Sequence, residues 1–328
     1  MAEIERMQQS QIIPTTTPIV LRQSAKFPVE RRPTRRELSE DPQERIDDWF
    51  KNSGIEIREA ADTFERQASA RRLLYTWKDC FIKRIRDIKP TDLLYHSIDL
   101  RPKVKTQKSR VPRYTIRERE FAARIFPEME EAGIIVRGAS DWGARTRFVP
   151  KKSGLDLRIV HCFIPVNDVT IKPQYPMHRI DEVLETVIRP KHTCFFITDG
   201  SNGYWAVKIK PGDEYKAAFV TPHGQYLYLR MGQGLIGAPH TYAQFTDLVF
   251  GPLPKSSTQP RMDSLIGTHQ EGGFSPFMDD HIGGFNDFDS QFQFLHTKYF
   301  PRVVFGPISL SASKTKVFVK TLELVGFM

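Results

Sequence analysis

Two adjacent carboxylates, Asp279 and Asp280, stand inside the run FSPFMDDHIGGF (residues 274–285), which is otherwise mostly aromatic, apolar and glycine. Ionising neighbouring acids beside apolar strands costs free energy, because the charges repel each other and lose hydration. The composition of MDDHIGG is also typical of a surface hairpin turn, since Asp and Gly tolerate the backbone angles of such turns. Taken alone, the pair favours this simpler interpretation.

A third carboxylate changes that balance. Asp199 directly follows the apolar run CFFIT (194–198) and precedes a glycine, so we expect it at the end of a buried strand. Acids at the ends of buried strands can offset one another's charge by sharing cations. Mg²⁺ suits such a site, with Mn²⁺ as the alternative, because it takes oxygen ligands and binds through carboxylates and substrate phosphates. Two ions about 3.5–4 Å apart would serve an in-line phosphoryl displacement.

Helices are predicted from apolar spacing and from their end signals. TIRE (115–118) fits a capping box, and its helix should stop at Gly133, with a kink or a restart at Pro127. Apolar residues also recur at helical spacing in HRIDEVLETV (178–187) and after Pro239, which suits the first position of a helix. A further helix is expected near residues 289–299.

Strands are predicted between these helices. TRFVPKKSGLDLRIV reads as two strands around a turn at Gly154, and KAAFV and YLYLRM form a hairpin across TPHG. CFFIT and YWAVKIK are strand-like runs separated by DGSNG. The mixed order of elements predicts an α+β fold, with helices packed on an antiparallel sheet.

Charge and cysteine content narrow the class of protein. The 48 Lys and Arg residues exceed the 39 acids and give a net charge of +9, which favours a polyanionic partner such as nucleic acid. The three cysteines are widely spaced without a CxxC pair, which argues against disulfides and a zinc knuckle. We find neither a signal peptide nor an apolar run of about 18 residues. We therefore expect a soluble, intracellular, non-secreted protein without membrane contact. The compartment stays open, with a cytoplasmic particle and the nucleus as the alternatives.

The chain divides into three parts by composition. Residues 1–45 are polar and turn-rich, and we expect a disordered basic arm. Its Arg31, Arg32, Arg35 and Arg36 would form a solvated tail or contact phosphates. Residues 46–114 are predicted to be a helical leader followed by a basic linker, and 115–328 form the organised domain.

From about Arg71 to Met328 the chain resembles the polymerase region of Ty3/gypsy-type LTR-retrotransposon reverse transcriptases, in the form found in filamentous fungi. Six motifs carry the resemblance, in the family's order and over about 200 residues. They are the fingers block EEAGIIVRGASDWGARTRFVPKKSGLDLRIVHCFIPVN, the first-aspartate motif FFITDGSNGYW, the glycine-rich MGQGLIGAPHTYAQF, the FMDD box, LSASKTKVF, and LELVGF, which resembles the primer-grip hairpin.

The resemblance implies fingers and palm subdomains, with an antiparallel ferredoxin-like palm sheet backed by helices. It implies an RNA-directed DNA polymerase that binds an RNA or DNA template–primer and a dNTP. Asp199, Asp279 and Asp280 match the family's metal-binding carboxylates, and Lys314 matches a lysine proposed to protonate the departing pyrophosphate. From the residues alone, Lys314 reads equally as a solvated lysine.

Residues that would contact the dNTP follow from the same motifs. Tyr204 matches an aromatic wall that excludes a ribose 2′-hydroxyl, and Gln233 matches a residue that contacts the incoming nucleotide. The simpler interpretations are a packed core tyrosine and a turn glutamine. The other matching positions are the box residues Phe277 and Met278, and the triphosphate clamp of Lys151 or Lys152 with Arg158, which otherwise reads as a solvated hairpin.

Three departures from the family pattern stand out. Phe277 replaces the tyrosine of the box, and Cys162 and Ile164 replace an Asp and an Arg of the fingers block. We find no thumb, RNase H, integrase or protease motifs. An alternative hypothesis is therefore a truncated or decayed retroelement fragment that binds nucleic acid without significant polymerase activity. A third hypothesis is a cyclase-type nucleotidyl transferase. The sequence does not say whether the chain is part of a longer polyprotein. It also leaves open the identity of the primer and template and the oligomeric state.

Overall fold

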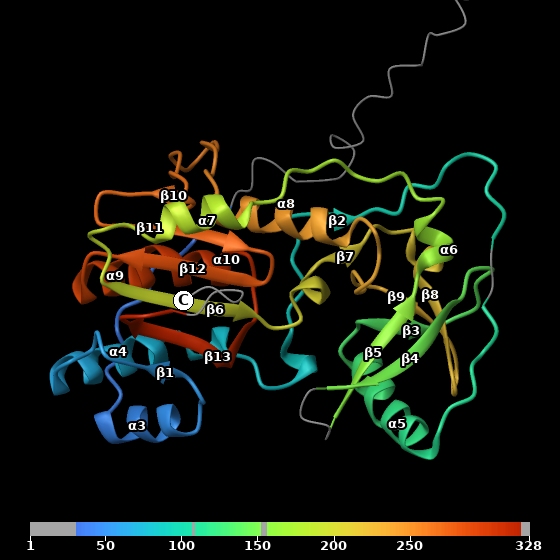
Figure 1. Cartoon of the computed structure of the whole chain (residues 1–328), viewed down its shortest axis with the longest axis horizontal. Coiled ribbons are helices and arrows are strands. Elements are labelled where there is room, and N and C mark those ends of the chain that lie inside the picture. The colour runs from blue at the N-terminus through green and yellow to red at the C-terminus, as the bar shows by residue number, and fades with distance from the viewer. Residues whose placement is uncertain (1–30, 107–108, 152–155, 323–328) are drawn as a thin grey trace, which may run out of the picture.

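The computed structural model describes residues 31–322 except 107–108 and 152–155. At its centre is a six-stranded sheet, here called the palm sheet, which occupies the left half of Figure 1. All of its strand pairs are antiparallel except the parallel pair of β1 with β13. The strands, in spatial order, are β1 (Glu56–Ile57), β13 (Leu310–Val319), β6 (Cys194–Gly200), β12 (Asp280–Phe285), β11 (Gly272–Phe277) and β10 (Gly267–Thr268).

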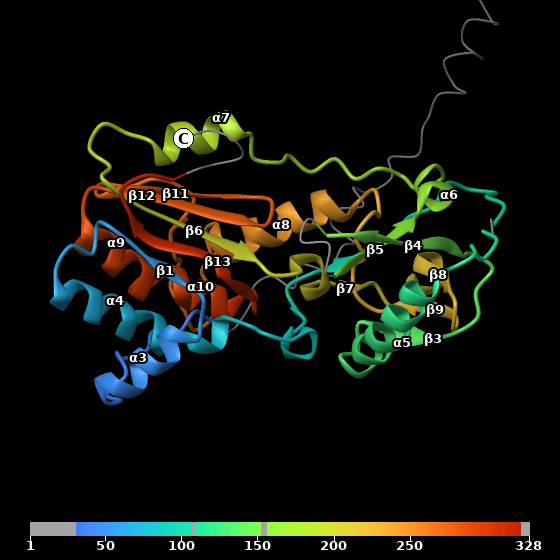
Figure 2. The ribbon, with the colours of Figure 1, turned by 60° about the horizontal axis from the view of Figure 1, so that its bottom comes forward.

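Helices cover both faces of the palm sheet, as Figure 2 shows. Helix α7 (Ile180–Val187) lies on one face, where glycines in β11 and β12 let its backbone approach. The opposite face is aromatic, with the Phe196 and Tyr299 ring centroids 5.3 Å apart. It packs against α8 (Ala238–Phe250), α9 (Phe288–Phe294), a π-helix (Leu295–Tyr299) and α10 (Phe300–Phe305). The predicted helix at 289–299 is therefore part of a longer helical segment.

A five-stranded sheet, here called the fingers sheet, occupies the right half of Figure 1. Helix α5 (Ile116–Glu131) packs against it through Phe126, whose ring stacks 5.4 Å from Tyr226. The strands, in spatial order, are β3 (Ile135–Arg137), β9 (Gly224–Tyr228), β8 (Ala218–Thr221), β4 (Ala144–Pro150) and β5 (Leu157–Cys162). The predicted β8–β9 hairpin and β4–β5 pair are confirmed; Gly154 lies outside the described residues.

The capping box predicted for α5 is present, with Thr115 accepting from the Glu118 backbone N–H and the Glu118 side chain accepting in return. The predicted restart at Pro127 is wrong, because α5 continues through it to Glu131. Proline removes one backbone hydrogen bond, and burial of Phe126 and Met129 on either side of it offsets that loss.

The predicted strand YWAVKIK is mostly wrong. Asn202 has a φ of +50°, and the chain then forms the 3₁₀ helix η3 (Gly203–Ala206) before the short strand β7 (Lys208–Ile209). Strand β7 pairs with β2 (Tyr95–His96), outside the two larger sheets. Gly203 packs against the Tyr242 ring, so tertiary packing here decides the local structure.

The leader is part of the palm. Helices α3 (Gln43–Lys51) and α4 (Phe64–Thr76) flank β1, which covers the edge of β13. Residues 31–45 of the expected arm lie in the described part of the chain, and α3 begins within them at Gln43. The Arg36 guanidinium donates to both carboxylate oxygens of Asp79, at 2.6 and 2.8 Å, and lies 4.6 Å from the centre of the Trp77 ring. For Arg36 these contacts replace the expected exposure to solvent, because a carboxylate and an aromatic ring both bind a guanidinium.

Short 3₁₀ and helical turns complete the described chain: η1 (Lys78–Cys80), η2 (Ile85–Asp87), α6 (Ile164–Asn167) and η4 (Glu214–Ala217). Within the described ranges, no helix combines the length and the apolar character that a membrane crossing requires. Most of LELVGF, from residue 323 onward, lies outside those ranges.

Candidate active site

The three carboxylates singled out in the sequence lie together at one end of the palm sheet. Asp280, the first residue of β12, is the cross-strand partner of Asp199 near the end of β6. Asp279 stands in the two-residue turn between β11 and β12, and its carbonyl accepts from the Gly200 N–H at 2.7 Å. Directly opposed residues on paired strands place their side chains about 4.5–5.5 Å apart at Cβ. The fold thus brings Asp199 beside Asp279 and Asp280, which are adjacent to each other but distant from it in sequence.

Burial, and then the crowding of the three acids, raises the pKa of two of them. Burial raises the pKa of Asp279 to about 7, with the charges of Asp199 and Asp280 adding to the shift and that of Lys314 opposing it. The pKa of Asp280 is also raised, by burial first and by Asp199 second. Asp279 Oδ1 is buried without a hydrogen-bond partner among the described residues. The folded chain therefore maintains an electrostatic strain that a bound cation would relieve.

Lys314 reaches the carboxylates from strand β13. Its Nζ lies 2.8 Å from Asp199 Oδ1, and the Asp199 side chain is only 16% exposed. The pairing of β13 with β6 is irregular between Ser311 and Lys316, and Lys314 lies within this bulge. The sequence motif placed a lysine near the site; the ion pair with Asp199 emerges only in the folded chain.

Tyr204 and a second tyrosine form the wall beside the carboxylates. The Tyr204 ring meets the Tyr242 ring edge-on, with centroids 5.4 Å apart. Burial, and secondarily the charge of Asp279, raises the pKa of Tyr204 to about 12. A Cβ added at Gly200 or Gly203 would lie 2.8 or 2.5 Å from the Tyr242 hydroxyl, so glycine is required at both positions. The sequence predicted only a helix after Pro239 for this region, and it did not indicate that the Tyr242 hydroxyl lies beside the acidic turn.

A cavity opens beside this wall. Tyr204, Phe277 and Met278 line it together with the start of α7 and one face of α8. Phe277 also packs against the small apolar cluster beneath α7. Met278 is 57% exposed and has a φ of +51°, as the tight turn requires. These three predicted dNTP contacts therefore adjoin the carboxylates.

The other predicted contacts lie elsewhere. Gln233 is exposed in the connection from β9 to α8, beside Gly234, whose φ is +93°. Arg158 is exposed on β5, opposite Val149 of β4, and thus belongs to the fingers sheet rather than the palm sheet (Figure 1). Lys151 Nζ lies 2.6 Å from Asp156 Oδ2, a partner that the sequence did not indicate. Lys152 lies outside the described residues.

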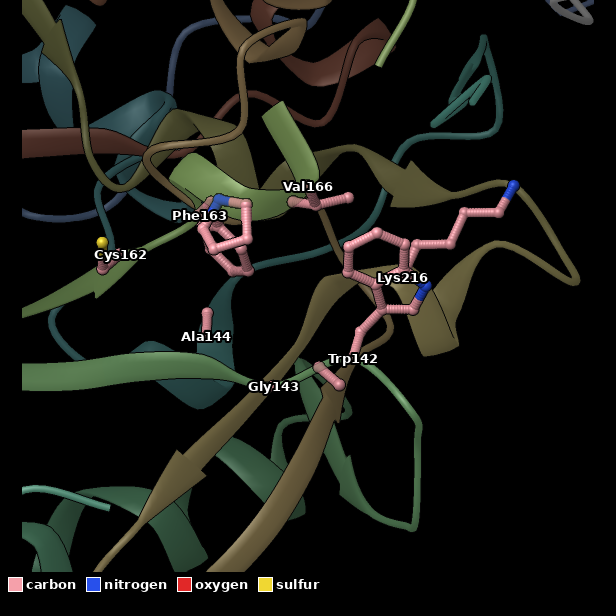
Figure 3. Close-up of a pocket in the computed structure, with 9 residues that line it drawn as sticks. Trp142, Gly143, Ala144, Cys162, Phe163, Val166 and Lys216 are labelled. Carbon is pink, nitrogen blue, oxygen red and sulfur yellow. The ribbon is translucent and has the colours of Figure 1, made fainter. Parts of the chain in front are cut away.

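Cys162 and Ile164, the two departures from the family pattern in the fingers block, lie near a small pocket. Cys162 lines it together with Trp142, Phe163 and Lys216, and the side chains of Cys162 and Lys216 extend to opposite sides (Figure 3). Cys162 is exposed, and Ile164 is 61% exposed. The lining is largely apolar, and the Lys216 ammonium is bound by Asp213 and the Ile98 carbonyl, so this pocket offers no arrangement for catalysis.

His281 follows Asp280 in sequence, but its side chain lies in the protein core. Its side chain is fully buried, and Nδ1 lies 2.8 Å from the Tyr299 hydroxyl. Burial lowers the pKa of His281 to about 3, so the ring is neutral. The adjacent residues Asp280 and His281 therefore face opposite sides of β12, one toward the site and one toward the core.

The donor set suits a hard divalent cation, because all three side chains offer carboxylate oxygens. In the described part of the chain, however, no three acidic, His or Cys side chains already converge on a single point as metal ligands. Asp199 is engaged by Lys314, and one oxygen of Asp279 is turned into the interior. Ion binding at these acids therefore requires side-chain rearrangement.

Comparison with known proteins shows what this chain is similar to. The family model described as "Reverse transcriptase (RNA-dependent DNA polymerase)" matches residues 149–328. The transposon Tf2-7 and Tf2-3 polyproteins of Schizosaccharomyces pombe are each 31% identical to this chain over 137 residues. Those matches cover 42% of this chain and 10% of each polyprotein, so the chain spans a small part of these relatives.

Solved structures with the same fold include the foamy viral protease-reverse transcriptase. Its complex with an RNA/DNA hybrid aligns with a TM-score of 0.69 at 16% identity, covering 90% of this chain and 36% of that one. The dRH form in complex with double-stranded DNA aligns with a TM-score of 0.70 at 17% identity, covering 90% and 47%. These structures confirm the fold class predicted from the sequence. The family model and the Tf2 polyproteins confirm the resemblance to retrotransposon reverse transcriptases.

Proposed function

This chain belongs to the reverse transcriptase (RNA-dependent DNA polymerase) family, and from that membership we propose that it catalyses template-directed DNA synthesis by two-metal nucleotidyl transfer. A primer 3′-hydroxyl attacks the α-phosphorus of a dNTP, and pyrophosphate leaves. The observation that carries the proposal is the direct cross-strand pairing of Asp280 with Asp199, with Asp279 in the adjoining turn. A nucleic-acid partner is supported by the foamy viral enzymes, which were solved with an RNA/DNA hybrid and with double-stranded DNA.

Asp199, Asp279 and Asp280 would hold the divalent ions, Mg²⁺ or Mn²⁺, which supply charge neutralisation and hydroxyl activation when bound. The chain itself contributes mainly position and charge. Tyr204, held edge-on by Tyr242, forms the wall beneath the sugar of the incoming nucleotide. Phe277 and Met278 shape the same cavity.

The remaining polar residues act on the triphosphate. Arg158, and Lys151 after it releases Asp156, clamp the phosphates from the fingers sheet. Lys152 would join them. Gln233 contacts the nucleotide from its exposed turn. Lys314 Nζ lies 2.8 Å from Asp199 Oδ1, and this lysine gives a proton to the departing pyrophosphate once it has left Asp199.

Primer extension on an RNA template tests the function. With Mg²⁺ and dNTPs, the wild type is expected to incorporate nucleotides, and Asp199→Asn and Asp280→Asn are expected to lose more than about a hundredfold of that activity. Each substitution removes a negative charge and a carboxylate ligand from the proposed metal site. Asp289→Asn, an exposed acid in the first turn of α9, is the matched control and should retain wild-type activity.

Two results would contradict the proposal. Extension by Asp280→Asn at the wild-type rate would show that the reaction does not require the Asp280 carboxylate. Salt-sensitive binding of primer–template by the wild type, without any incorporation, would instead favour a nucleic-acid-binding remnant.

The wall formed by Tyr204 gives a second prediction. Tyr204→Ala should raise ribonucleotide incorporation relative to deoxyribonucleotide incorporation by at least about tenfold, because room opens for the 2′-hydroxyl. Tyr204→Phe keeps the ring and should keep the wild-type ratio. The ratio is measured by single-nucleotide extension with paired dNTP and rNTP substrates. An unchanged ratio in Tyr204→Ala would exclude the wall from sugar selection.

A further inference from the structure

We propose that Lys314 is the resident counter-ion of Asp199, and that it must leave this carboxylate before a divalent ion binds there. In the metal-free protein, the ammonium group then occupies the place where a cation is needed. The inference rests on the proposed function only in taking Asp199 as a metal ligand. It assigns Lys314 a role in metal binding, separate from proton transfer to pyrophosphate.

The contact itself is specific. Lys314 Nζ lies 2.8 Å from Asp199 Oδ1 across 115 positions of sequence. Asp199 is mostly buried, whereas the lysine side chain is 65% exposed. A buried carboxylate beside two others needs a cation, and an exposed lysine can swing into solvent at little cost. Among the ion pairs of the described residues, this one alone involves an acid of the carboxylate trio.

The backbone of β13 is built to present this lysine. Ser311 faces Asp199 and Lys316 faces Ile197, so five residue steps on β13 correspond to two on β6. The extra length forms a bulge that contains Lys314, and bulges commonly re-aim side chains beside active sites. The Thr315 hydroxyl donates to the Ser311 carbonyl at 2.8 Å and closes the bulge.

The leader supports the bulge from the other side. Glu56 of β1 pairs with Lys316 just beyond it, and Gly54 approaches Ser313, where an added Cβ would lie 3.6 Å from the Ser313 Cα. The bulge is therefore fixed at both ends, while the Lys314 side chain remains free to move between Asp199 and solvent. This arrangement gives an exchangeable cation on a rigid support.

A metal-binding assay without nucleotide or template isolates this role. Mn²⁺ binding is measured by electron paramagnetic resonance for the whole chain, its Lys314→Gln variant and Lys316→Gln as the control. Lys316 is on the same strand and loses the same charge, but it faces Ile197 and Glu56 rather than the carboxylates. Each variant is first shown to be folded by circular dichroism.

We expect Lys314→Gln to bind Mn²⁺ about two- to fivefold more tightly than the wild type, since the competing ion pair is lost. Lys316→Gln should change affinity less, and Lys314→Arg, which keeps a competing cation, should match the wild type. Unchanged or weaker binding by Lys314→Gln overturns the counter-ion role, as does an equal gain in Lys316→Gln. If neither the wild type nor Asp199→Asn binds Mn²⁺, the counter-ion role, the metal site and the proposed function are all contradicted.

Discussion

Asp279→Asn is expected to raise the free energy of unfolding of the metal-free protein at pH 8 by about 1–3 kcal/mol, while abolishing nucleotide incorporation. The reason is the pKa of Asp279, which burial and then its acidic neighbours raise to about 7. In the unfolded chain an aspartate titrates near 4. The folded state therefore keeps a proton that the unfolded state releases between about pH 4 and 7.

The sign of the pH dependence follows. The contribution of Asp279 to stability is complete below about pH 4 and is lost as pH rises to about 7, with an upper bound of about 4 kcal/mol. Asparagine keeps nearly the same shape without the charge and should abolish this slope. The carboxylates repel one another, so part of the strain remains on Asp199 and Asp280 in the variant, and the expected gain is smaller than the bound.

Urea denaturation in the presence of EDTA, from pH 5 to 9, measures the effect. The wild type should lose stability relative to Asp279→Asn as pH rises, and the two curves should converge toward pH 5. Added Mg²⁺ should stabilise the wild type more than the variant. Asp289→Asn serves as the control and should follow the wild-type profile. Parallel curves for wild type and Asp279→Asn would show that the acid is not strained in the folded chain.

Gly284→Ala is expected to destabilise the protein by about 3 kcal/mol or more, or to prevent soluble expression. A Cβ at Gly284 would lie 2.2 Å from the Val187 carbonyl oxygen, and one at Gly273 would lie 2.1 Å from the Thr186 carbonyl oxygen. Both obstacles are backbone atoms at the end of α7, so relief requires the helix to move away from the sheet. That movement would also disturb β12, which carries Asp280.

The measurement is the midpoint of thermal or urea unfolding for Gly284→Ala and Gly273→Ala. Gly143→Ala is the comparison, because its Cβ would meet only side-chain atoms, of Val220 at 3.3 Å and of Gln225 at 3.6 Å, and should cost less than about 1 kcal/mol. Equal stability of Gly284→Ala and Gly143→Ala would contradict the close packing of α7 on β11 and β12.

Much of the fold was predictable because its signals are local. The Thr115 capping box fixes the start of α5, and the turn TPHG joins strands that are neighbours in sequence. The carboxylates were also identifiable, since an acid at the end of an apolar run is unusual. That Asp199 lies beside Asp279 and Asp280 was only a hypothesis from the sequence. The pairing of β6 with β12 closes a loop of about 80 residues, and no local sequence pattern specifies it.

The sequence by itself therefore determined most of the segments that become helices and strands, and which acids stand at strand ends. Only the tertiary structure decided the partners: Lys314 on Asp199, Lys151 on Asp156, and Arg36 between Asp79 and Trp77. It also turned part of YWAVKIK into a 3₁₀ helix against Tyr242. The physical reason is that propensity and periodicity act within a few residues, whereas charge pairing and close packing depend on which distant surfaces meet.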